Sequence, residues 1–334
     1  MQNLTVLLVY CFLNLFSAEQ PQRKFQITGH AQGTTFQVTY YAADSLVTST
    51  QIDSVLEKID SSLSIYKPYS LINSFNRSKR GIRVDEHLQI VVKKALETYT
   101  ATEEIFDITV QPLVKAWGFG VKSNSTLPDS ATIKAIKRCV GSNMIHLKGN
   151  MLIKDKPCVT IDVNGIAQGY TVDVLASLIE KTGVKNYIVE LGGEIRIKGR
   201  RQPANEPMKI GIEAPADSPF DPEVMQKIIS IEDGAVTTSG SYRKYYESNG
   251  KKISHIIDPR NGYPMNNELI SVTVYASDAI TADAYDNALM VMGLSRAMKF
   301  VDDHPEIAAN FIYRLPDGSI ADTATKVFSS FMLR

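Results

Sequence analysis

The sequence has no excess of charge, because 36 Lys and Arg residues balance 36 Asp and Glu residues among its 334 residues. It also has no block of basic residues, no interleaving of basic with aromatic residues, and no cysteine spacing typical of zinc sites. Proteins that bind nucleic acid or anionic membranes through charge usually present a basic surface, and structural zinc sites need closely spaced ligands. The sequence therefore predicts no nucleic-acid partner and no zinc site of this kind.

Long hydrophobic runs are absent too, since the apolar run near the N-terminus covers only 13 residues, 4–16. A membrane span takes about 20 residues, whereas a run of this length suits the core of a signal peptide. Ser17 and Ala18 follow, so we predict a signal peptide over residues 1–18, although no Lys or Arg precedes the run. Export is the expectation, and retention as an uncleaved membrane anchor is the alternative.

Cysteine is rare, with three residues in the chain. Cys11 lies inside the apolar run and follows a tyrosine, which makes a poor lipidation site, so lipid anchoring is the less favoured alternative. Cys139 and Cys158 remain after cleavage and could pair in an oxidising compartment. Their spacing proves nothing, and two small buried residues are the favoured interpretation.

The sequence does contain both strand and helix patterns. Alternating apolar residues predict a strand at 36–41, and a glycine-poor, alternating stretch predicts a buried strand at 269–276. Amphipathic stripes predict one helix capped by Ser49 or Thr50 and a second capped by Asp85.

These elements favour an α+β fold, because several strands and about five helices mix without the strict alternation of a doubly wound sheet. Gly192-Gly193 predicts a tight hairpin turn between two strands. Trp117 is predicted to pack in the core. We predict one domain over residues 25–334, with the polar loop 121–130 as the candidate for an internal seam.

The richest chemistry lies between residues 237 and 293. The stretch Thr237–Gly240 predicts a small hydroxyl-rich turn, and His255 and Asp258 stand just before a Pro-Arg-Asn-Gly turn. Asp283 and Asn287 are four residues apart in a predicted helix, so both side-chain oxygens project from one face. This spacing suits a hard cation held by two protein oxygens, with water and a ligand's phosphates as its other ligands.

Other positions allow two interpretations each. Gly165 and Gly169, at the start of a predicted helix, allow a phosphate seat at the helix N-terminus or close helix–strand packing. The stretch 33–35 is a bend, which we favour, or a set of donors facing a ligand. Tyr66 caps the core or stacks on an aromatic ligand. Asp107 lies among apolar neighbours, where a carboxylate needs a partner.

Eight segments of the sequence resemble those of a known family, the ApbE-type flavin transferases, or FAD:protein FMN transferases. Any one segment would be a weak signal, but they occur in the family's order and cover nearly the whole chain after Phe25. They are GHAQGTTFQVTYY, SIYKPYSLINSFN, FDITVQPLVKAWGFG, IDVNGIAQGYTVD, VELGGEI, AVTTSGSYRKYY, SHIIDPRNGYP and ADAYDNALMVMG.

The resemblance implies a magnesium-dependent enzyme that binds FAD as a substrate, cleaves its pyrophosphate and transfers the FMN half to a threonine hydroxyl of an exported protein. AMP is then released. It also implies an α+β arrangement related to the tunnelling fold, action outside the cytoplasm in the periplasm, and an acceptor such as a subunit of a redox-driven membrane complex.

Carried over residue by residue, the resemblance implies a role for each of a dozen or so positions. His255 would be the base for the acceptor hydroxyl, and Asp283 would be catalytic as the principal Mg²⁺ ligand. Asn287 stands where family members usually have Thr, but it still offers a neutral oxygen. The implied metal ligands are the side chains of Asp283 and Asn287 with the backbone oxygens of Gly165 and Asp286, and the implied FAD contacts are Gln32, Tyr66, Phe106, Asp107, Asp162, Gln168 and Ile256.

The chemistry of these residues is consistent with that function. A pyrophosphate diester is a poor electrophile until its charge is neutralised, and a divalent cation can do this. A threonine hydroxyl is a weak nucleophile that gains from a base such as histidine. The other histidines are predicted to be structural or at the surface, and His30 is the one nearest a predicted FAD contact.

Two other functions stay open. The same site could pass FMN to water and work as an FAD pyrophosphatase, or the protein could be a flavin-binding carrier without turnover. Self-modification at the C-terminal stretch 317–325 is the least favoured, since a Pro-Asp-Gly turn explains that stretch equally well.

Overall fold

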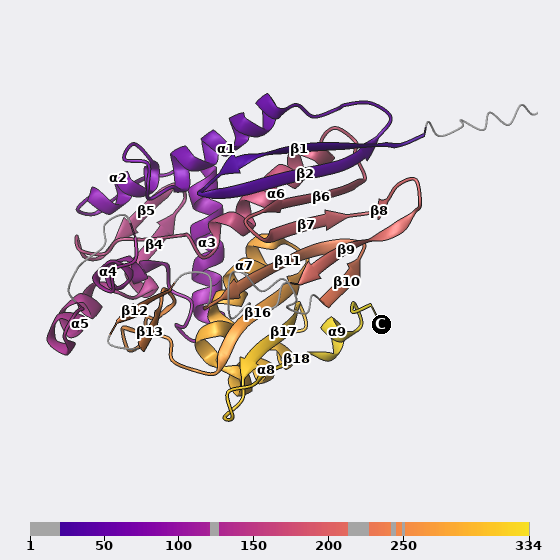
Figure 1. The fold of residues 1–334 in the computed structure, drawn as a ribbon. Helices are drawn as coiled ribbons and strands as arrows, with labels where there is room; N and C mark the ends of the chain where they lie inside the picture. Colours follow the sequence, from indigo (N-terminus) through magenta and orange to yellow (C-terminus); the bar gives the residue numbers. More distant parts are fainter. Residues whose placement is uncertain (1–20, 121–126, 213–226, 242–244, 249–250, 334) are drawn as a thin grey trace, which may run out of the picture.

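The computed structural model describes residues 21–120, 127–212, 227–241, 245–248 and 251–333 (Figure 1). The predicted signal peptide and Cys11 lie outside the described residues, as do residues 121–126 of the predicted seam. Mixed helices and antiparallel sheets confirm the α+β prediction. The division into one domain stays a prediction.

An eight-stranded antiparallel sheet forms the centre of the molecule. Two of its inner strands, β11 and β16, pair in register, so Ala235 lies opposite Ala276 and Thr237 opposite Val274. The buried strand predicted at 269–276 is confirmed as β16. In spatial order the strands are β1 (Arg23–Ala31), β2 (Thr34–Ala42), β6 (Asn186–Leu191), β7 (Glu194–Lys198), β11 (Asp233–Gly240), β16 (Leu269–Ala276), β17 (Ile307–Arg314) and β18 (Ile320–Ala324).

Two helices cover one face of this sheet. Helix α6 (Ala167–Glu180) contacts β6 and β7, and α7 (Ala279–Met292) contacts β11 and β16. Helix α7 begins where the Asp278 side chain accepts a hydrogen bond from the Thr281 N–H, and it ends at Gly293, whose φ is +74°. Helix α8 (Leu294–Asp302) then packs beside β17.

The opposite face is covered by a small sheet of β8 (Arg200–Arg201), β9 (Glu206–Ile212) and β10 (Lys227–Ile231). Because strand residues alternate between faces, Ala235 packs in the cluster that contains α6, whereas its neighbour Val236 packs against Ile210 and Ile229. Helix α9 (Lys326–Ser329) adds Phe328 to this second cluster.

A helical lobe extends from one end of the sheet. It combines α1 (Ser49–Leu63), α2 (Leu71–Arg77) and α3 (Glu86–Ala101) with a three-stranded sheet of β3 (Gly81–Arg83), β5 (Met151–Lys154) and β4 (Ile145–Lys148). The predicted cap of α1 was wrong by one residue, because Thr48 forms a capping box with Gln51. Asp85 caps α3 as predicted.

A separate hydrophobic cluster surrounds Trp117, which is buried and donates from Nε1 to the Gly262 carbonyl at 2.8 Å. This confirms the predicted core packing of Trp117. The remaining elements are η1 (Ile108–Val110), α4 (Gln111–Ala116), α5 (Ser130–Ile136), η2 (Lys137–Cys139), η3 (Ser142–Met144), β12 (Tyr245–Ser248), β13 (Lys251–Ser254), β14 (Ile257–Asp258) and β15 (Tyr263–Pro264).

The two remaining cysteines form a disulfide, so the prediction of two small buried residues was wrong. Cys158 is exposed and Cys139 is half-buried. Sequence spacing could not reveal the bond, because it depends on the chain after α5 meeting the chain after β5, which places the two Cα atoms 5.6 Å apart.

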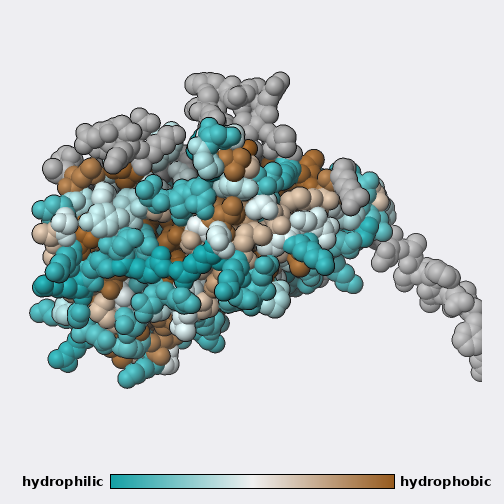
Figure 2. All heavy atoms as spheres, turned by 90° about the horizontal axis from the view of Figure 1, so that it is seen from below, coloured by the Kyte–Doolittle hydropathy of each residue, from teal (hydrophilic) through white to brown (hydrophobic). Residues whose placement is uncertain are grey.

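The surface shows no dominant apolar face in the view from below, where hydrophobic residues form separate groups among hydrophilic ones (Figure 2). Scattered apolar side chains are normal on a protein surface. Within the described ranges, no helix combines the length and the apolar character that a bilayer crossing requires.

Candidate active site

A pocket of about 460 Å³ opens among the helical lobe, the α7 face of the main sheet and the Trp117 cluster. Every residue to which the sequence assigned a role in catalysis, cofactor binding or metal binding lines this one pocket, although their roles stay predictions. They are Gln32, Tyr66, Phe106, Asp107, Asp162, Gly165, Gln168, His255, Ile256, Asp283, Asp286 and Asn287.

The β1–β2 hairpin brings Gln32 to the pocket. Gln32 and Gly33 both have positive φ angles, 52° and 80°, which is typical of a two-residue turn between antiparallel strands. The Gln32 side chain donates to the Thr171 hydroxyl on α6 at 2.9 Å. The turn lies at residues 32–33, at the edge of the bend predicted for 33–35, whereas Thr34 already begins β2. Gly33 and Thr34 also line the pocket, so the alternative of donors that face a ligand stays open.

Asp107 has the partners that its burial requires. Its carboxylate accepts hydrogen bonds from the N–H and hydroxyl groups of Thr109, at 2.7 and 2.6 Å, and of Ser142, at 3.2 and 2.7 Å. Burial raises the pKa of Asp107, and these donors oppose that shift. The prediction that this carboxylate needs a partner is confirmed.

Helices α6 and α7 hold each other through a carboxylate on each. Ile166 at the start of α6 gives no side-chain cap, and the Asp283 Oδ2 atom accepts from the Gly169 N–H at 2.8 Å instead. In return, the Asp173 carboxylate accepts from the Ala279 and Ile280 N–H groups, at 3.0 and 2.9 Å. Each acid therefore lies at the positive end of the other helix, where its charge is favoured.

Gly169 serves close packing, but its partner is a helix and not the predicted strand. A Cβ atom at this position would lie 2.3 Å from the Ala279 carbonyl oxygen and 2.6 Å from the Asp283 Cβ. The two helices can approach this closely only because residue 169 has no side chain.

We expect Gly169→Ala to lower the free energy of unfolding by about 2 kcal/mol, since α6 and α7 must move apart. Gly165→Ala is the matched comparison, because its new Cβ would meet the Asn287 side chain at 3.3 Å and not a backbone atom. Urea unfolding of both variants measures the difference. Equal stability of the two variants would contradict the proposed helix contact.

Asp283 and Asp286 bring two buried carboxylates into the pocket, with exposures of 3% and 1%. Burial raises the pKa of Asp283, and repulsion from Asp173 adds to the shift. Burial also raises the pKa of Asp286 well above its usual value, and the charges of Asp283 and Glu194 add to it. A cation in the pocket would relieve this concentration of negative charge.

The buried carboxylate of Asp173 makes the free energy of unfolding depend on pH. Burial raises the pKa of Asp173 to about 6, with Asp278 adding to the shift, whereas the carboxyl in the unfolded chain has its ordinary pKa of 3.8. The folded state therefore holds the proton to higher pH, and its contribution to stability is lost as the pH rises from about 4 to about 6.

We expect Asp173→Asn to remove this loss, because the amide does not ionise. Between pH 4 and pH 7 the stability difference should shift by about 2 kcal/mol in favour of the variant. Urea unfolding at both pH values, with chelator present, tests this. Parallel stability curves for the two proteins would show that Asp173 is not responsible.

Asn287 connects the predicted metal ligands in the present arrangement. Its Nδ2 atom donates to Asp286 Oδ1 at 2.9 Å and to the Gly165 carbonyl at 3.5 Å, while Oδ1 accepts from the Ser239 hydroxyl at 3.3 Å. The oxygen and nitrogen of this amide are nearly isosteric, so the amide can turn over in the same space. A half-turn of this amide would bring its oxygen toward the two other oxygens.

The donor set suits Mg²⁺ by its chemistry, because it consists of carboxylate, amide and carbonyl oxygens. It contains only two acidic side chains, and among the described residues no cluster of three or more His, Cys, Asp or Glu side chains is arranged to hold a metal ion. Water and substrate phosphate oxygens would therefore have to complete the coordination of a cation here.

The stretch Thr237–Gly240 is not a turn, contrary to the prediction, but the end of strand β11. It pairs in register with β16, and this long-range pairing overrides the local turn preference of the residues. Thr237 and Ser239 lie on the face toward α7, where Ser239 contacts Asn287, whereas Thr238 bonds to Thr273 at 2.9 Å.

His255 lies between β13 and β14, with its ring centroid 6.2 Å from that of Phe119 in an edge-to-face arrangement. The neighbouring Asp258 instead binds Arg260 within the turn, at 2.9 and 3.0 Å. His30 is exposed on β1 and does not line the pocket.

The remaining histidines have the structural or surface contacts predicted for them. His87 bonds to Tyr170 at 2.8 Å, His146 to Asp155 at 2.9 Å, and His304 to the Phe300 carbonyl at 2.7 Å.

Sequence reasoning missed three residues that shape the pocket or its helices. Glu194 is buried at the start of β7, Phe119 packs against His255, and Asp173 binds the start of α7. Each stands inside a segment that resembles the family, and this was the signal in the sequence that could have identified them. Nothing in the local pattern showed that these side chains meet residues more than 90 positions away.

Comparison with known proteins gives one consistent result. The model of the ApbE family matches residues 32–311. A protein from Vibrio cholerae named FAD:protein FMN transferase is 36% identical, with 99% of each chain covered. The solved structure of the flavin transferase ApbE from Vibrio cholerae has a TM-score of 0.84 at 35% identity, covering 93% of this chain and 100% of its own. The apo flavinyl transferase ApbE from Pseudomonas stutzeri has a TM-score of 0.84 at 30% identity, covering 93% and 97%.

Proposed function

The chain belongs to the ApbE family, and from this we propose that it transfers the FMN half of FAD to a threonine hydroxyl of another protein and releases AMP. The observation that carries the proposal is the convergence of all the family-matched site residues on one pocket. Relatives of similar length bear the name FAD:protein FMN transferase, which supports the same activity here.

The lining of the pocket offers side chains suited to both kinds of group in FAD. Ile105, Phe106 and Ile256 give it buried apolar walls, and Tyr66 offers a ring that is 57% exposed. Aromatic and apolar side chains suit a flavin ring. The carboxylates of Asp283 and Asp286 are suited to a cation that accompanies the diphosphate.

Mg²⁺, held by Asp283, Asp286, Asn287 and the Gly165 carbonyl, would supply charge neutralisation for the pyrophosphate. The chain's own residues position the reactants. His255 takes the proton from the threonine hydroxyl, the threonine oxygen bonds to the phosphorus of the FMN half, and the bond from that phosphorus to the bridging oxygen breaks. AMP takes up the electron pair of that bond.

We also propose that the protein works outside the cytoplasm, in the periplasm, on an exported acceptor such as a subunit of a redox-driven membrane complex. The Cys139–Cys158 disulfide supports this location, because disulfides persist mainly in oxidising compartments. The apolar run near the N-terminus supports it as a signal peptide or membrane anchor.

Incubation with FAD, Mg²⁺ and an exported threonine-bearing candidate tests the proposal. We expect flavin fluorescence to migrate with the acceptor on a denaturing gel, in equal amount to the AMP released. Replacing the acceptor threonine by valine is the control and should abolish both. Labelling that persists in this control would rule out transfer to that hydroxyl.

Hydrolysis is the second candidate, because the exposed Tyr66 leaves one side of the pocket open to water. FAD with Mg²⁺ alone distinguishes the two functions. Fast AMP release without an acceptor would favour an FAD pyrophosphatase, and release that depends on the acceptor would favour transfer. Tight FAD binding with no AMP under either condition would indicate a carrier.

A further inference from the structure

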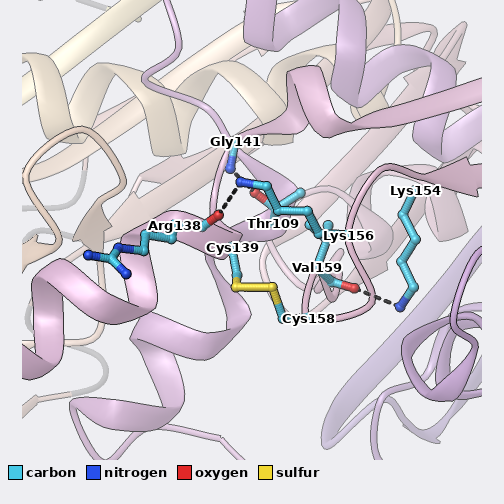
Figure 3. Close-up of a disulfide and its surroundings, with 8 residues drawn as sticks. All are labelled: Thr109, Arg138, Cys139, Gly141, Lys154, Lys156, Cys158 and Val159. Atoms are coloured by element: carbon cyan, nitrogen blue, oxygen red, sulfur yellow. Dashed lines mark hydrogen bonds between the residues drawn. A yellow bond between two sulfur atoms is a disulfide. The ribbon is translucent and has the colours of Figure 1, made fainter.

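The Cys139–Cys158 disulfide is placed to act on the pocket, although no step of the proposed reaction uses it. Cys158 is exposed and Cys139 is half-buried, so small thiols can reach the bond. The two cysteines close a loop that contains η3 and the β4–β5 hairpin (Figure 3). Each cysteine begins a short segment, here called an arm, that leads to a predicted FAD contact.

The first arm runs from Cys139 to Ser142. The Gly141 N–H donates to the Thr109 hydroxyl at 2.6 Å (Figure 3), and Ser142 donates twice to the Asp107 carboxylate. Asp107 lines the pocket. Because the Gly141 and Ser142 N–H groups are backbone donors, movement of this arm must disturb the hydrogen bonds of Asp107.

The second arm runs from Cys158 to Asp162. The Val159 carbonyl accepts from the Lys154 ammonium at 2.8 Å (Figure 3). Asn76 bonds to both the N–H and the carbonyl of Ile161, at 2.8 and 2.9 Å. These bonds leave the arm little freedom as it enters the pocket wall at Asp162.

Lys154 holds the second arm in place at the Val159 carbonyl. Lys154 is 3% exposed and packs against the Phe75 ring, and its ammonium donates to the carbonyls of Val159 and Asn76. A buried ammonium is costly unless its donors are satisfied. Displacement of the Val159 carbonyl would remove an acceptor from this buried ammonium, so Lys154 resists movement of the second arm.

The two arms meet again at the pocket. The Asp162 N–H donates to the Ile108 carbonyl at 2.7 Å, and Ile108 lies between Asp107 and Thr109, which hold the first arm. The disulfide thus closes a ring whose far side is the pocket wall. Reduction of the disulfide opens the ring only on its exposed side. Any effect on the pocket must therefore pass through the hydrogen bonds of the two arms.

We propose that the Cys139–Cys158 disulfide is a positioning element of the flavin pocket, which raises FAD affinity when it is formed and lowers it when it is reduced. The proposal rests on the proposed function, because it takes FAD as the ligand. A dithiol reduces the bond by giving two electrons and two protons to it. Cys139 and Cys158 become thiols, and the two sulfurs of the dithiol form a cyclic disulfide.

Linkage gives this proposal a signature that a purely structural disulfide lacks. If the oxidised protein binds FAD about fivefold more tightly than the reduced protein, FAD must make the disulfide about fivefold harder to reduce. For a two-electron couple, that factor corresponds to about 20 mV in reduction potential.

The first experiment compares FAD binding by the wild-type protein and the Cys139→Ser/Cys158→Ser double variant, measured by flavin fluorescence at 25 °C with Mg²⁺ present. We expect the Kd to rise about fivefold in the variant. Val301→Ala, which removes buried side-chain atoms from α8 away from the pocket, is the control for lost stability and should bind like the wild type. Equal weakening in both variants would overturn the proposal.

The second experiment needs no variant, so it stands even if the double variant folds poorly. The wild-type protein is equilibrated in a series of dithiothreitol redox buffers with and without saturating FAD, and its free thiols are counted. A shift toward the disulfide on adding FAD supports the proposal, and coincident curves overturn it. Failure of the oxidised protein to bind FAD at all would overturn the proposed function as well, whereas equal binding by both redox states overturns only this proposal.

Discussion

Asp283→Ala is expected to reduce AMP release from FAD by at least about 10³-fold. The carboxylate is 3% exposed, and its Oδ2 atom is fixed by the Gly169 N–H at 2.8 Å. This leaves Oδ1 as the oxygen available to a cation in the pocket. Alanine removes that charge, and the neutral amide of Asn287 cannot replace it. Single-turnover AMP release at saturating Mg²⁺ measures the effect.

Two further variants separate charge from structure at this position. Asp283→Asn keeps the volume and one acceptor for Gly169, so it should fold like the wild type yet release AMP almost as slowly as Asp283→Ala. Asp302→Asn, on the exposed end of α8, removes a carboxylate elsewhere and should leave the rate unchanged. Full activity of Asp283→Ala at high Mg²⁺ would refute the metal-site assignment.

His255→Ala should slow FMN transfer by about 10²- to 10⁴-fold, the usual contribution of a general base, while FAD binding changes little. The imidazole lines the pocket beside Phe119. A base acts on the acceptor hydroxyl and is not required to hold the flavin, so its removal should lower the transfer rate and leave the FAD affinity almost unchanged. Transfer under saturating acceptor and a separate FAD titration give the two quantities.

His30→Ala is the matched control for this experiment, because His30 is exposed on β1 and does not line the pocket. It should transfer FMN at the wild-type rate. If His255→Ala weakens FAD binding and transfer by the same factor, His255 is a binding residue and not the base.

Local sequence patterns were sufficient for elements whose structure depends on near neighbours. Asp85 caps α3 through the Leu88 N–H three residues away, and Gly192-Gly193 joins β6 to β7. The spacing of Asp283 and Asn287 placed them in one helix, α7, because helical periodicity relates residues four apart. The identity of the site residues came from ordered family segments, which carry information that periodicity alone does not.

Long-range pairing decided where local preference misled. The hydroxyl-rich stretch at 237–240 has turn-forming residues, but hydrogen bonding to β16 makes it a strand and turns the Ser239 hydroxyl toward Asn287. Gly169 was expected to approach a strand or a phosphate, and it approaches α7 because Asp283 caps the helix that contains it.

The sequence by itself determined the class of fold and the helices and strands with strong patterns, and its family-matched segments indicated which side chains line the pocket. Only the tertiary structure decided that Cys139 and Cys158 are bonded, that Glu194 lies in the pocket near Asp286, and that Asp173 and Asp283 each cap the other's helix. The reason is physical. Backbone sterics act within a few residues, and burial of one face of a helix or strand leaves apolar residues at a regular spacing in the sequence. Contacts between distant segments, in contrast, depend on how the whole chain packs.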